Sequence, residues 1–266
     1  QVEQIYREKI FNENVAAIEQ HNADKTQTYK MGINQFTDLT QSEFATIYLT
    51  LKVNKRFERT VSAKPATIVG DVDWVSAGKV TGVKNQGNCG SCWAFSTTAA
   101  VESAYLLRGQ PVLLSEQQLV DCSGAYGNYG CNGGWMDSAF QYIIDHGITS
   151  QDAYPYVAVN QVCKIDGGQY RLGGFVDVQG CDNLQNALSQ QPISVAVDAG
   201  NWSSYRSGVF GNCATSVNHG VLLVGVTDSY WVIKNSWGTG WGEGGFIRLN
   251  KGNTCAVCNY PSYPRI

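Results

Sequence analysis

At residues 86–96 the chain reads Gln86-Gly-Asn-Cys-Gly-Ser-Cys-Trp-Ala-Phe-Ser96, with two cysteines three positions apart. Gly87 and Gly90 permit tight, irregular backbone turns, and the apolar run from Trp93 to Leu107 predicts a buried helix. Cys92 should then lie at the N-terminus of that helix, where unpaired N–H groups and the helix dipole favour negative charge. Because a thiol loses its proton readily in such a place, and the thiolate is the nucleophile, the stretch predicts a reactive cysteine.

Two other readings of a Cys-x-x-Cys pair are a zinc half-site and a redox pair. A zinc site needs a second pair of ligands at matching spacing. A thioredoxin-like pair is expected in a cytosolic chain with few other cysteines. Neither context is found in this chain, which favours the nucleophile.

The segment Cys89-Gly-Ser-Cys-Trp93 resembles the signature around the active-site cysteine of the papain family, which includes the cathepsins. The resemblance implies that Cys92 is the nucleophile and that Cys89 is part of a disulfide. It also implies a papain-like architecture, with a helical lobe, a β-barrel-like lobe and the active-site cleft between them.

Composition narrows the class of protein. The chain has 266 residues, of which 43% are hydrophobic and 15% charged, so it can bury a full core. Its formal charge of −3 and the lack of a clustered basic run argue against nucleic-acid binding. No apolar stretch approaches the ~18 residues of a membrane span.

Cysteine usage indicates the compartment. Nine cysteines suggest an oxidising environment, and their odd number leaves at least one thiol unpaired, with Cys92 the candidate. We therefore expect the secretory pathway, with a lysosome or acidic vacuole as destination or with secretion. Gln1 opens directly into a polar segment, so a leader peptide is expected to have been removed or left out. Asn201-Trp-Ser203 matches a glycosylation sequon, whose use the sequence leaves open.

Residues 1–66 contain no cysteine, whereas residues 67–266 contain all nine, and this change marks a domain boundary. The first segment predicts an amphipathic helix. It also resembles the inhibitory propeptides of the papain family, although their aromatic-rich first helix is missing. One matching motif, ERFNIN, is spread over Glu3, Arg7, Ile10, Phe11, Asn14, Ile18 and Asn22; the other, GNFD, corresponds to Gly32-Ile-Asn-Gln-Phe-Thr-Asp38.

The rest of this segment predicts a clamp over the cleft. Thr40-Gln-Ser-Glu43 forms a capping box ahead of a helix ending near Leu49. The resemblance implies that residues 52–66 form a strand-like tail that runs through the cleft in reverse, with the segment around residues 47–61 blocking it; a plain linker is the alternative. Cleavage is expected between Lys64 and Gly70. We expect Asp38 to be the paired carboxylate whose protonation weakens the clamp in acid.

The second segment predicts an α+β fold, because helices in its first half are followed by strands. Helices are expected from Trp93 to Leu107, ended by Gly109, from a capping box at Ser115–Gln118 to Cys122, and from Trp135 to His146, ended by Gly147. Strands are expected at Ile193–Val197, Gly220–Val226, Tyr230–Lys234 and Gly245–Leu249.

A thiol nucleophile needs a base and an orienting group. Of three histidines, His21 lies in the propeptide-like segment and His146 at a predicted helix end, where it is expected to be structural. His219, 127 positions after Cys92, remains as the base. The resemblance adds Asn235 as the group that orients the imidazole without adding a negative charge.

The resemblance also completes the oxyanion hole and the cover of the catalytic pair. Gln86 would donate its side-chain N–H to the oxyanion, together with the backbone N–H of Cys92. Trp237 would shield the hydrogen bond between His219 and Asn235 from water. The reaction implied is acyl transfer through a thioester, without metal or organic cofactor. Its partners are protein and peptide substrates and the chain's own propeptide, and a monomer is expected.

The disulfides are paired from the family pattern, which joins Cys89 to Cys131, Cys122 to Cys163, and Cys213 to Cys255. Parity then suggests a fourth bridge from Cys181 to Cys258, at about 2–4 kcal/mol for each bridge.

Substrate specificity follows from the same resemblance. The S2 pocket is expected to be uncharged, with Tyr260 at its floor, and to favour leucine or valine at P2 over phenylalanine and arginine. The expected substrate-binding residues are Gly133, Gly134, Trp135, Met136, Ala196, Val217, Asn218, Trp237, Trp241 and Tyr260.

Two other functions fit part of the pattern. A Cys-His hydrolase or acyltransferase of another fold would leave the propeptide motifs unexplained. An inactive homologue kept as a binding or inhibitory protein would be expected to have lost Cys92, His219 or Gln86, and all three are present.

Overall fold

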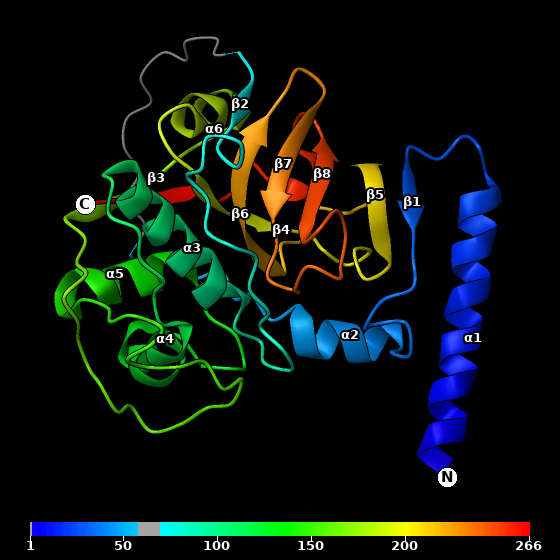
Figure 1. Cartoon of the computed structure of the whole chain (residues 1–266), viewed down its shortest axis with the longest axis horizontal. Coiled ribbons are helices and arrows are strands. Elements are labelled where there is room, and N and C mark those ends of the chain that lie inside the picture. Colours follow the sequence, from blue (N-terminus) through cyan, green and yellow to red (C-terminus); the bar gives the residue numbers. More distant parts are fainter. Residues whose placement is uncertain (1, 58–69) are drawn as a thin grey trace.

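The computed structural model describes residues 2–57 and 70–266 and has the expected α+β fold. In Figure 1 the helices α3, α4 and α5 gather on one side of the molecule and most of the strands on the other. The expected cleavage region at residues 64–69, and the tail from residue 58 to Ala66, lie outside the described residues. The described helices and helical turns are α1 (Val2–Ala23), α2 (Gln41–Tyr48), α3 (Cys92–Leu107), α4 (Glu116–Cys122), η1 (Ser123–Tyr126), α5 (Met136–His146), α6 (Cys181–Leu188) and η2 (Thr254–Ala256).

The helix α3 is the central element of the fold. Its own side chains are mostly small or apolar on every face of the helix. All of its residues from Cys92 to Tyr105 are buried, as expected for a helix that is hydrophobic all round. Gly109 follows its end with a φ of 73°, in the left-handed region that favours glycine. Ser96 Oγ donates to the Val221 carbonyl at 2.7 Å, and Ser194 Oγ donates to the Ser96 carbonyl at 3.0 Å. These bonds hold the first turn of α3 against the sheet.

The described strands form one nine-stranded sheet in the order β1-β5-β8-β7-β6-β4-β9-β3, with β2 paired to β6 off this path. The pair β5–β8 is parallel, and the other pairs are antiparallel. Every residue of β6 is buried. The strands are β1 (Tyr29–Met31), β2 (Val72–Asp73), β3 (Gly174–Asp177), β4 (Ile193–Val197), β5 (Tyr205–Phe210), β6 (His219–Val226), β7 (Tyr230–Lys234), β8 (Phe246–Asn250) and β9 (Ser262–Arg265).

The sequence did not anticipate every boundary. The last expected strand begins at Phe246, because Gly245 has a φ of 97°, which a strand does not use. The strand β5 was not expected, since its sequence Tyr-Arg-Ser-Gly-Val-Phe has one β-branched residue and a glycine. A helix, α6, interrupts the strand-rich half.

Of the two expected capping boxes, one is complete. Thr40 and Glu43 bond reciprocally at the start of α2. Ser115 Oγ accepts from the Gln118 N–H at 3.0 Å, but the Ser115 N–H donates to the Thr149 carbonyl at 3.1 Å. The Gln118 side chain has other partners: its oxygen accepts from the Thr149 N–H, and its nitrogen donates to the Tyr142 hydroxyl of α5. The second capping box is therefore only half formed.

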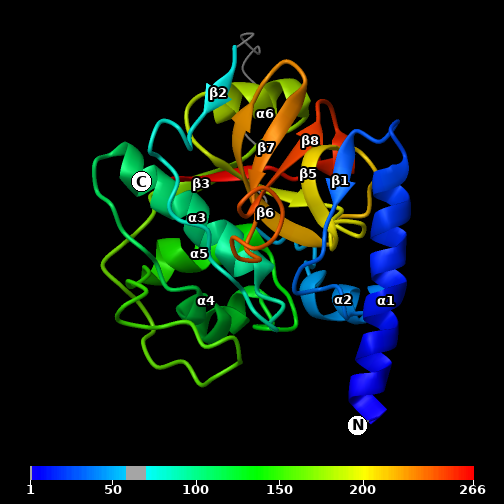
Figure 2. The ribbon, with the colours of Figure 1, turned by 45° about the vertical axis from the view of Figure 1, so that its right-hand side comes forward.

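The N-terminal segment covers the edge of the β lobe. Figure 1 and Figure 2 both show α1 standing beside β1, which lies next to β5. The strand β1 pairs antiparallel with β5, with Tyr29 opposite Gly208. The segment thus adds one strand to the sheet of the second domain, in line with a docked propeptide.

An ion pair joins α1 to α2. The Arg7 guanidinium donates to both carboxylate oxygens of Glu43, at 2.9 and 2.6 Å, and to the backbone carbonyl of Asp38 at 2.9 Å. The carboxylates that Arg7 bonds are therefore those of Glu43 and Glu3. Asp38, which the sequence analysis had expected to be the paired carboxylate, contributes its backbone carbonyl to Arg7. Hydrogen bonds from Arg7, and then from Thr40, lower the pKa of Glu43 to about 2.

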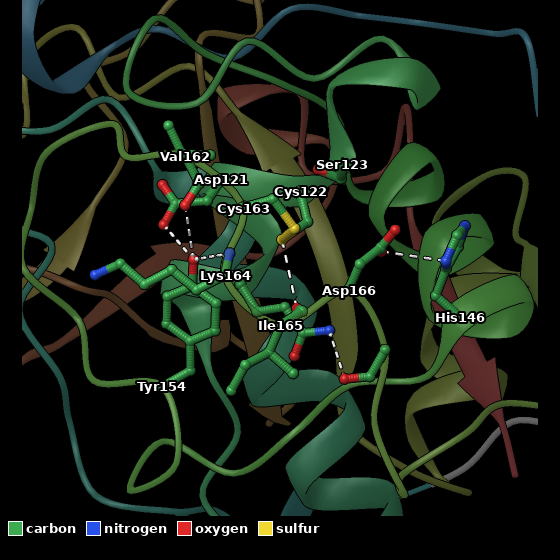
Figure 3. Close-up of a disulfide and its surroundings, with 12 residues drawn as sticks. Asp121, Cys122, Ser123, His146, Tyr154, Val162, Cys163, Lys164, Ile165 and Asp166 are labelled. Carbon is green, nitrogen blue, oxygen red and sulfur yellow. Dashed lines mark hydrogen bonds and ion pairs between the residues drawn. A yellow bond between two sulfur atoms is a disulfide. The ribbon is translucent and has the colours of Figure 1, made fainter.

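All nine cysteines lie in the described residues, and eight of them form four disulfides. These join Cys89 to Cys131, Cys122 to Cys163, Cys181 to Cys258, and Cys213 to Cys255, the same pairs that the sequence analysis names. Figure 3 shows the Cys122–Cys163 bridge, with Cys122 Sγ 3.5 Å from the Ile165 carbonyl oxygen. The free cysteine is Cys92, which is buried.

Titration of thiols in the unfolded but unreduced protein should therefore give one thiol per chain, and nine after reduction. The free thiol of the native protein should react slowly, because Cys92 is fully buried. Three thiols before reduction would contradict the Cys181–Cys258 bridge, the pair added by parity.

Candidate active site

Cys92 is the first residue of α3, and its side chain is completely buried. Backbone N–H groups of Gly220 and Trp93 and the hydroxyl of Thr50 face its sulfur, and each favours the thiolate. Burial is the larger effect and raises the pKa of Cys92 to about 11. The readily ionised thiol expected from the helix N-terminus is thus absent in this covered state, because excluding water outweighs the local dipoles.

His219 is the first residue of β6, and one of its ring nitrogens is held by Asn235. The distance from His219 Nε2 to Asn235 Oδ1 is 2.8 Å. The same Asn235 oxygen accepts from the backbone N–H of Ser236 at 2.8 Å. A backbone N–H can only donate, so this atom of Asn235 is the oxygen, and His219 must donate to it through Nε2.

This bond leaves the other ring nitrogen of His219 as the basic one. Among the described residues Nδ1 has no hydrogen-bond partner. Burial lowers the pKa of His219 to about 4, against smaller opposing effects of Asn235 and of the Tyr48 carbonyl. With the pKa of the thiol raised and that of the imidazole lowered, Cys92 and His219 are both neutral in the covered state.

Trp237, expected to shield the His219–Asn235 hydrogen bond, packs against the His219 ring. Its ring lies 4.7 Å from that of His219, centroid to centroid, and both residues are fully buried. Trp241, expected to bind substrate, lies behind Trp237 at 4.9 Å, and its indole N–H donates to the Trp202 carbonyl. The structure therefore places Trp241 as a support of Trp237.

Aromatic residues of the N-terminal segment pack on the outer side of Trp237. The rings of Phe36 and Phe44 meet it edge-on at 5.2 and 5.3 Å, and Tyr48 does so at 6.1 Å. The Gln35 amide donates to the Trp237 carbonyl at 2.7 Å. The N-terminal segment is thus anchored on Trp237, the residue that packs against His219.

Gln86 is held so that its amide nitrogen is presented to the site. Its Oε1 accepts from Ser236 Oγ at 2.8 Å and from the Trp237 indole N–H at 3.2 Å. Its Nε2 donates one hydrogen to the Cys89 carbonyl at 3.0 Å, and an amide nitrogen carries two. Ser236, which the sequence analysis missed, is the neighbour of Asn235 in the chain and joins it to Gln86.

Residues 50–52 of the N-terminal segment lie in the cleft. The Leu51 N–H donates to the Asn218 carbonyl, and the Lys52 N–H donates to the Gly134 carbonyl, both at 3.1 Å. A Cβ on Gly133, whose φ is 109°, would collide with the Thr50 carbonyl. The glycines and Asn218 expected to bind substrate backbone thus contact the backbone that occupies the cleft.

The Leu51 side chain occupies an apolar pocket beside these contacts. Leu51 is buried in one cluster with Met136 and Ala196, with Val217 and Tyr260 packed against that cluster.

Gly220 is a part of this pocket that the sequence analysis missed, although it directly follows His219. A Cβ there would lie 3.4 Å from Leu51 Cδ1 and 3.0 Å from Met136 Sδ. Trp135 and Tyr260 meet edge to face at 5.6 Å at one side of the pocket.

The other two histidines, His146 and His21, contact other polar groups. His146 Nδ1 lies 3.1 Å from Asp166 Oδ1, as Figure 3 shows, and Nε2 lies 3.1 Å from the Tyr126 hydroxyl. These side-chain contacts are in line with the structural role expected for His146. His21 Nε2 lies 3.1 Å from the Tyr29 carbonyl.

Comparisons with known proteins identify the family of this chain. The pattern of the papain family cysteine proteases matches residues 68–265. The chain belongs to the papain family. Residues 1–44 match the cathepsin propeptide inhibitor domain, so this papain-family protease carries its inhibitory propeptide.

Two relatives illustrate the likeness over the whole chain. Cathepsin L 2 of Paramecium tetraurelia is 46% identical over 272 residues, which cover 99% of this chain and 87% of the relative. The structure of digestive procathepsin L 3 from the larval midgut of Tenebrio molitor is 42% identical with a TM-score of 0.93, covering 100% of this chain and 93% of that one. The protein is thus a cathepsin L-like cysteine endopeptidase in its proenzyme form. In the part of the chain that the structure describes, no helix is long and apolar enough to cross a membrane.

Proposed function

We propose that this papain-family proenzyme hydrolyses peptide bonds through Cys92 and His219 once the propeptide has left the cleft. The observation that carries the proposal is the Ser236 N–H bond to Asn235 Oδ1. It makes Asn235 an acceptor for His219 Nε2–H and leaves Nδ1 to take the thiol proton.

The proposed reaction begins with that proton transfer. Removing residues 50–52 admits water to the site, which lessens the desolvation that keeps Cys92 and His219 neutral. The Cys92 thiolate attacks the carbonyl carbon, and imidazolium Nδ1–H protonates the departing amine. Water, deprotonated by the same nitrogen, then hydrolyses the thioester and releases the acid product.

Two donors would stabilise the tetrahedral oxyanion. One is the second amide hydrogen of Gln86 Nε2, whose orientation Ser236 and Trp237 determine. The other is the backbone N–H of Cys92, which has no intrahelical partner because it belongs to the first turn of α3. Loss of one such donor costs roughly 10²–10³ in kcat in another protease.

The domain boundary and location belong to the same proposal. We place the propeptide at residues 1–66 and the peptidase domain at residues 67–266, with cleavage between Lys64 and Gly70. Four disulfides support folding in the secretory pathway, and we propose a lysosome, an acidic vacuole or secretion as the destination. The protein would act as a monomer on protein and peptide substrates.

Leu51 supports an apolar P2 preference, because it is buried in one apolar cluster with the expected S2 residues and would stand in for a P2 side chain. The pocket residues named above are uncharged, and a buried guanidinium without a countercharge is strongly unfavourable. Tyr260, against which Trp135 packs, is expected to limit the depth of this pocket. A leucine or valine side chain therefore fits best.

Peptides that differ only at P2 test this proposal on the activated enzyme. We expect kcat/KM to be highest for leucine and valine, lower for phenylalanine and, for arginine, lower than for leucine by about tenfold or more, because the charge is left unpaired. Hydrolysis of arginine peptides as fast as leucine peptides would refute the apolar pocket. Absence of hydrolysis throughout the series would refute the endopeptidase reaction itself.

A further inference from the structure

A second hollow adjoins the expected S2 pocket. Its volume is about 460 Å³, and its walls come from the end of β3, the start of α5 and the segment around residues 253–261. It shares Trp135 and Tyr260 with the expected S2 lining, whereas Leu51 does not line it. The edge-to-face pair of Trp135 and Tyr260 therefore borders both spaces.

The hollow contains two carboxylates. Asp177 is at the C-terminal end of β3, and Asp137 lies in the first turn of α5, where its carboxylate accepts from the Trp135 indole N–H at 2.9 Å. The Cys181–Cys258 disulfide, the bridge outside the common family pattern, also lines the hollow and joins its two rims. The walls are thus covalently tied together.

The propeptide already places a cation in this hollow. Lys55 lines it, and its ammonium lies 5.6 Å from the centroid of the Tyr260 ring, within the range of a cation–π interaction. The chain passes from Thr50 beside Cys92, through Leu51 in the S2 pocket, to Lys55 in the hollow. A substrate residue at the place of Lys55 would therefore lie beyond P2, on the side away from the scissile bond.

We propose that this hollow is an extended substrate subsite for a lysine or arginine side chain at P3 or P4. The aromatic face of Tyr260 and the carboxylates of Asp137 and Asp177 recognise the cation, and Lys55 occupies the same place in the proenzyme. The proposal rests on the proposed peptidase activity and adds a basic residue beyond P2 to its apolar P2 residue.

The test measures kcat/KM of the activated enzyme on two pairs of peptides, all with leucine at P2. One pair has lysine or norleucine at P3, and the other pair has lysine or norleucine at P4. Norleucine keeps the side chain's length without the charge. We expect lysine to raise kcat/KM about tenfold at one of the two positions at low ionic strength. The advantage should shrink in 0.5 M salt, because exposed charges are then screened within a few ångströms.

Asp177→Asn should reduce the lysine advantage to within about twofold while leaving the norleucine peptides unaffected, which also shows that the variant is folded. Asp182→Asn is the matched control: it removes one nearby carboxylate that does not line the hollow and should keep the advantage. No lysine preference at either position, or a preference that Asp177→Asn leaves intact, would overturn the subsite. Failure to cleave even the norleucine peptides would instead overturn the proposed function.

Discussion

Replacing Cys92 by alanine is expected to lower kcat for peptide hydrolysis on the order of 10⁶-fold, as found on removing the nucleophile of a serine protease. The structure leaves no substitute, since Cys92 is the one free cysteine among the nine. The variant should also fail to remove its own propeptide at acid pH. A thiol-reactive epoxide should label activated wild-type enzyme once per chain, at Cys92, and should not label the variant.

The comparison needs a folded control. Ser103→Ala truncates another buried side chain of α3, one whose hydroxyl has no hydrogen-bond partner among the described residues. It should retain processing and labelling. The Cys92→Ala proenzyme is processed in trans by trace wild-type enzyme, which is then inactivated with the epoxide before the assay. Activity of the processed variant within about tenfold of wild type would place the nucleophile elsewhere.

Acid should open the proenzyme through His219, with the equilibrium shifting by close to tenfold per pH unit between about pH 6.5 and 4. In the closed state burial lowers the pKa of His219 to about 4, whereas an exposed imidazole has a pKa near 6.5. The closed state thus binds fewer protons in this interval, so its stability falls as the pH falls. The full shift corresponds to roughly 3 kcal/mol.

The ion pair of the propeptide responds at a different pH. Glu43 has a pKa of about 2 beside Arg7, so the stabilisation from this depressed pKa is complete above the ordinary glutamate pKa. It is lost progressively as the pH falls from the ordinary glutamate pKa to about 2. The pair therefore stays charged where His219 titrates. Neither Glu43 nor Asp38, the carboxylate expected from the sequence, is needed as the acid sensor.

Hydrogen exchange of α2 and residues 49–52 measures the opening in a Cys92→Ala background, where no self-processing occurs. After correction for intrinsic exchange, protection should fall steadily from pH 6.5 to 4. His219→Gln should flatten this dependence, whereas Glu43→Gln should keep its slope even if protection is lower throughout. Equal slopes with and without the histidine would exclude His219 as the sensor.

The sequence by itself determined the features that local chemistry specifies. The glycines before Cys92 and the apolar run after it predict the turn and the buried helix, because backbone freedom and the pattern of apolar residues act over a few positions. The α+β division and the helix-ending Gly109 follow in the same way. The papain-like resemblance extended this to His219 and Asn235, which only the fold brings together.

Features that depend on several segments were decided by the tertiary structure. The first turn of α3 indicated an ionised Cys92, but burial in the folded proenzyme raises its pKa to about 11. Arg7 pairs with Glu43, since the N-terminus of α2 faces α1. The bonds that orient Gln86 come through Ser236, 150 positions away. Solvation and long-range contacts set these properties, and neither can be read from the spacing of residues along the chain.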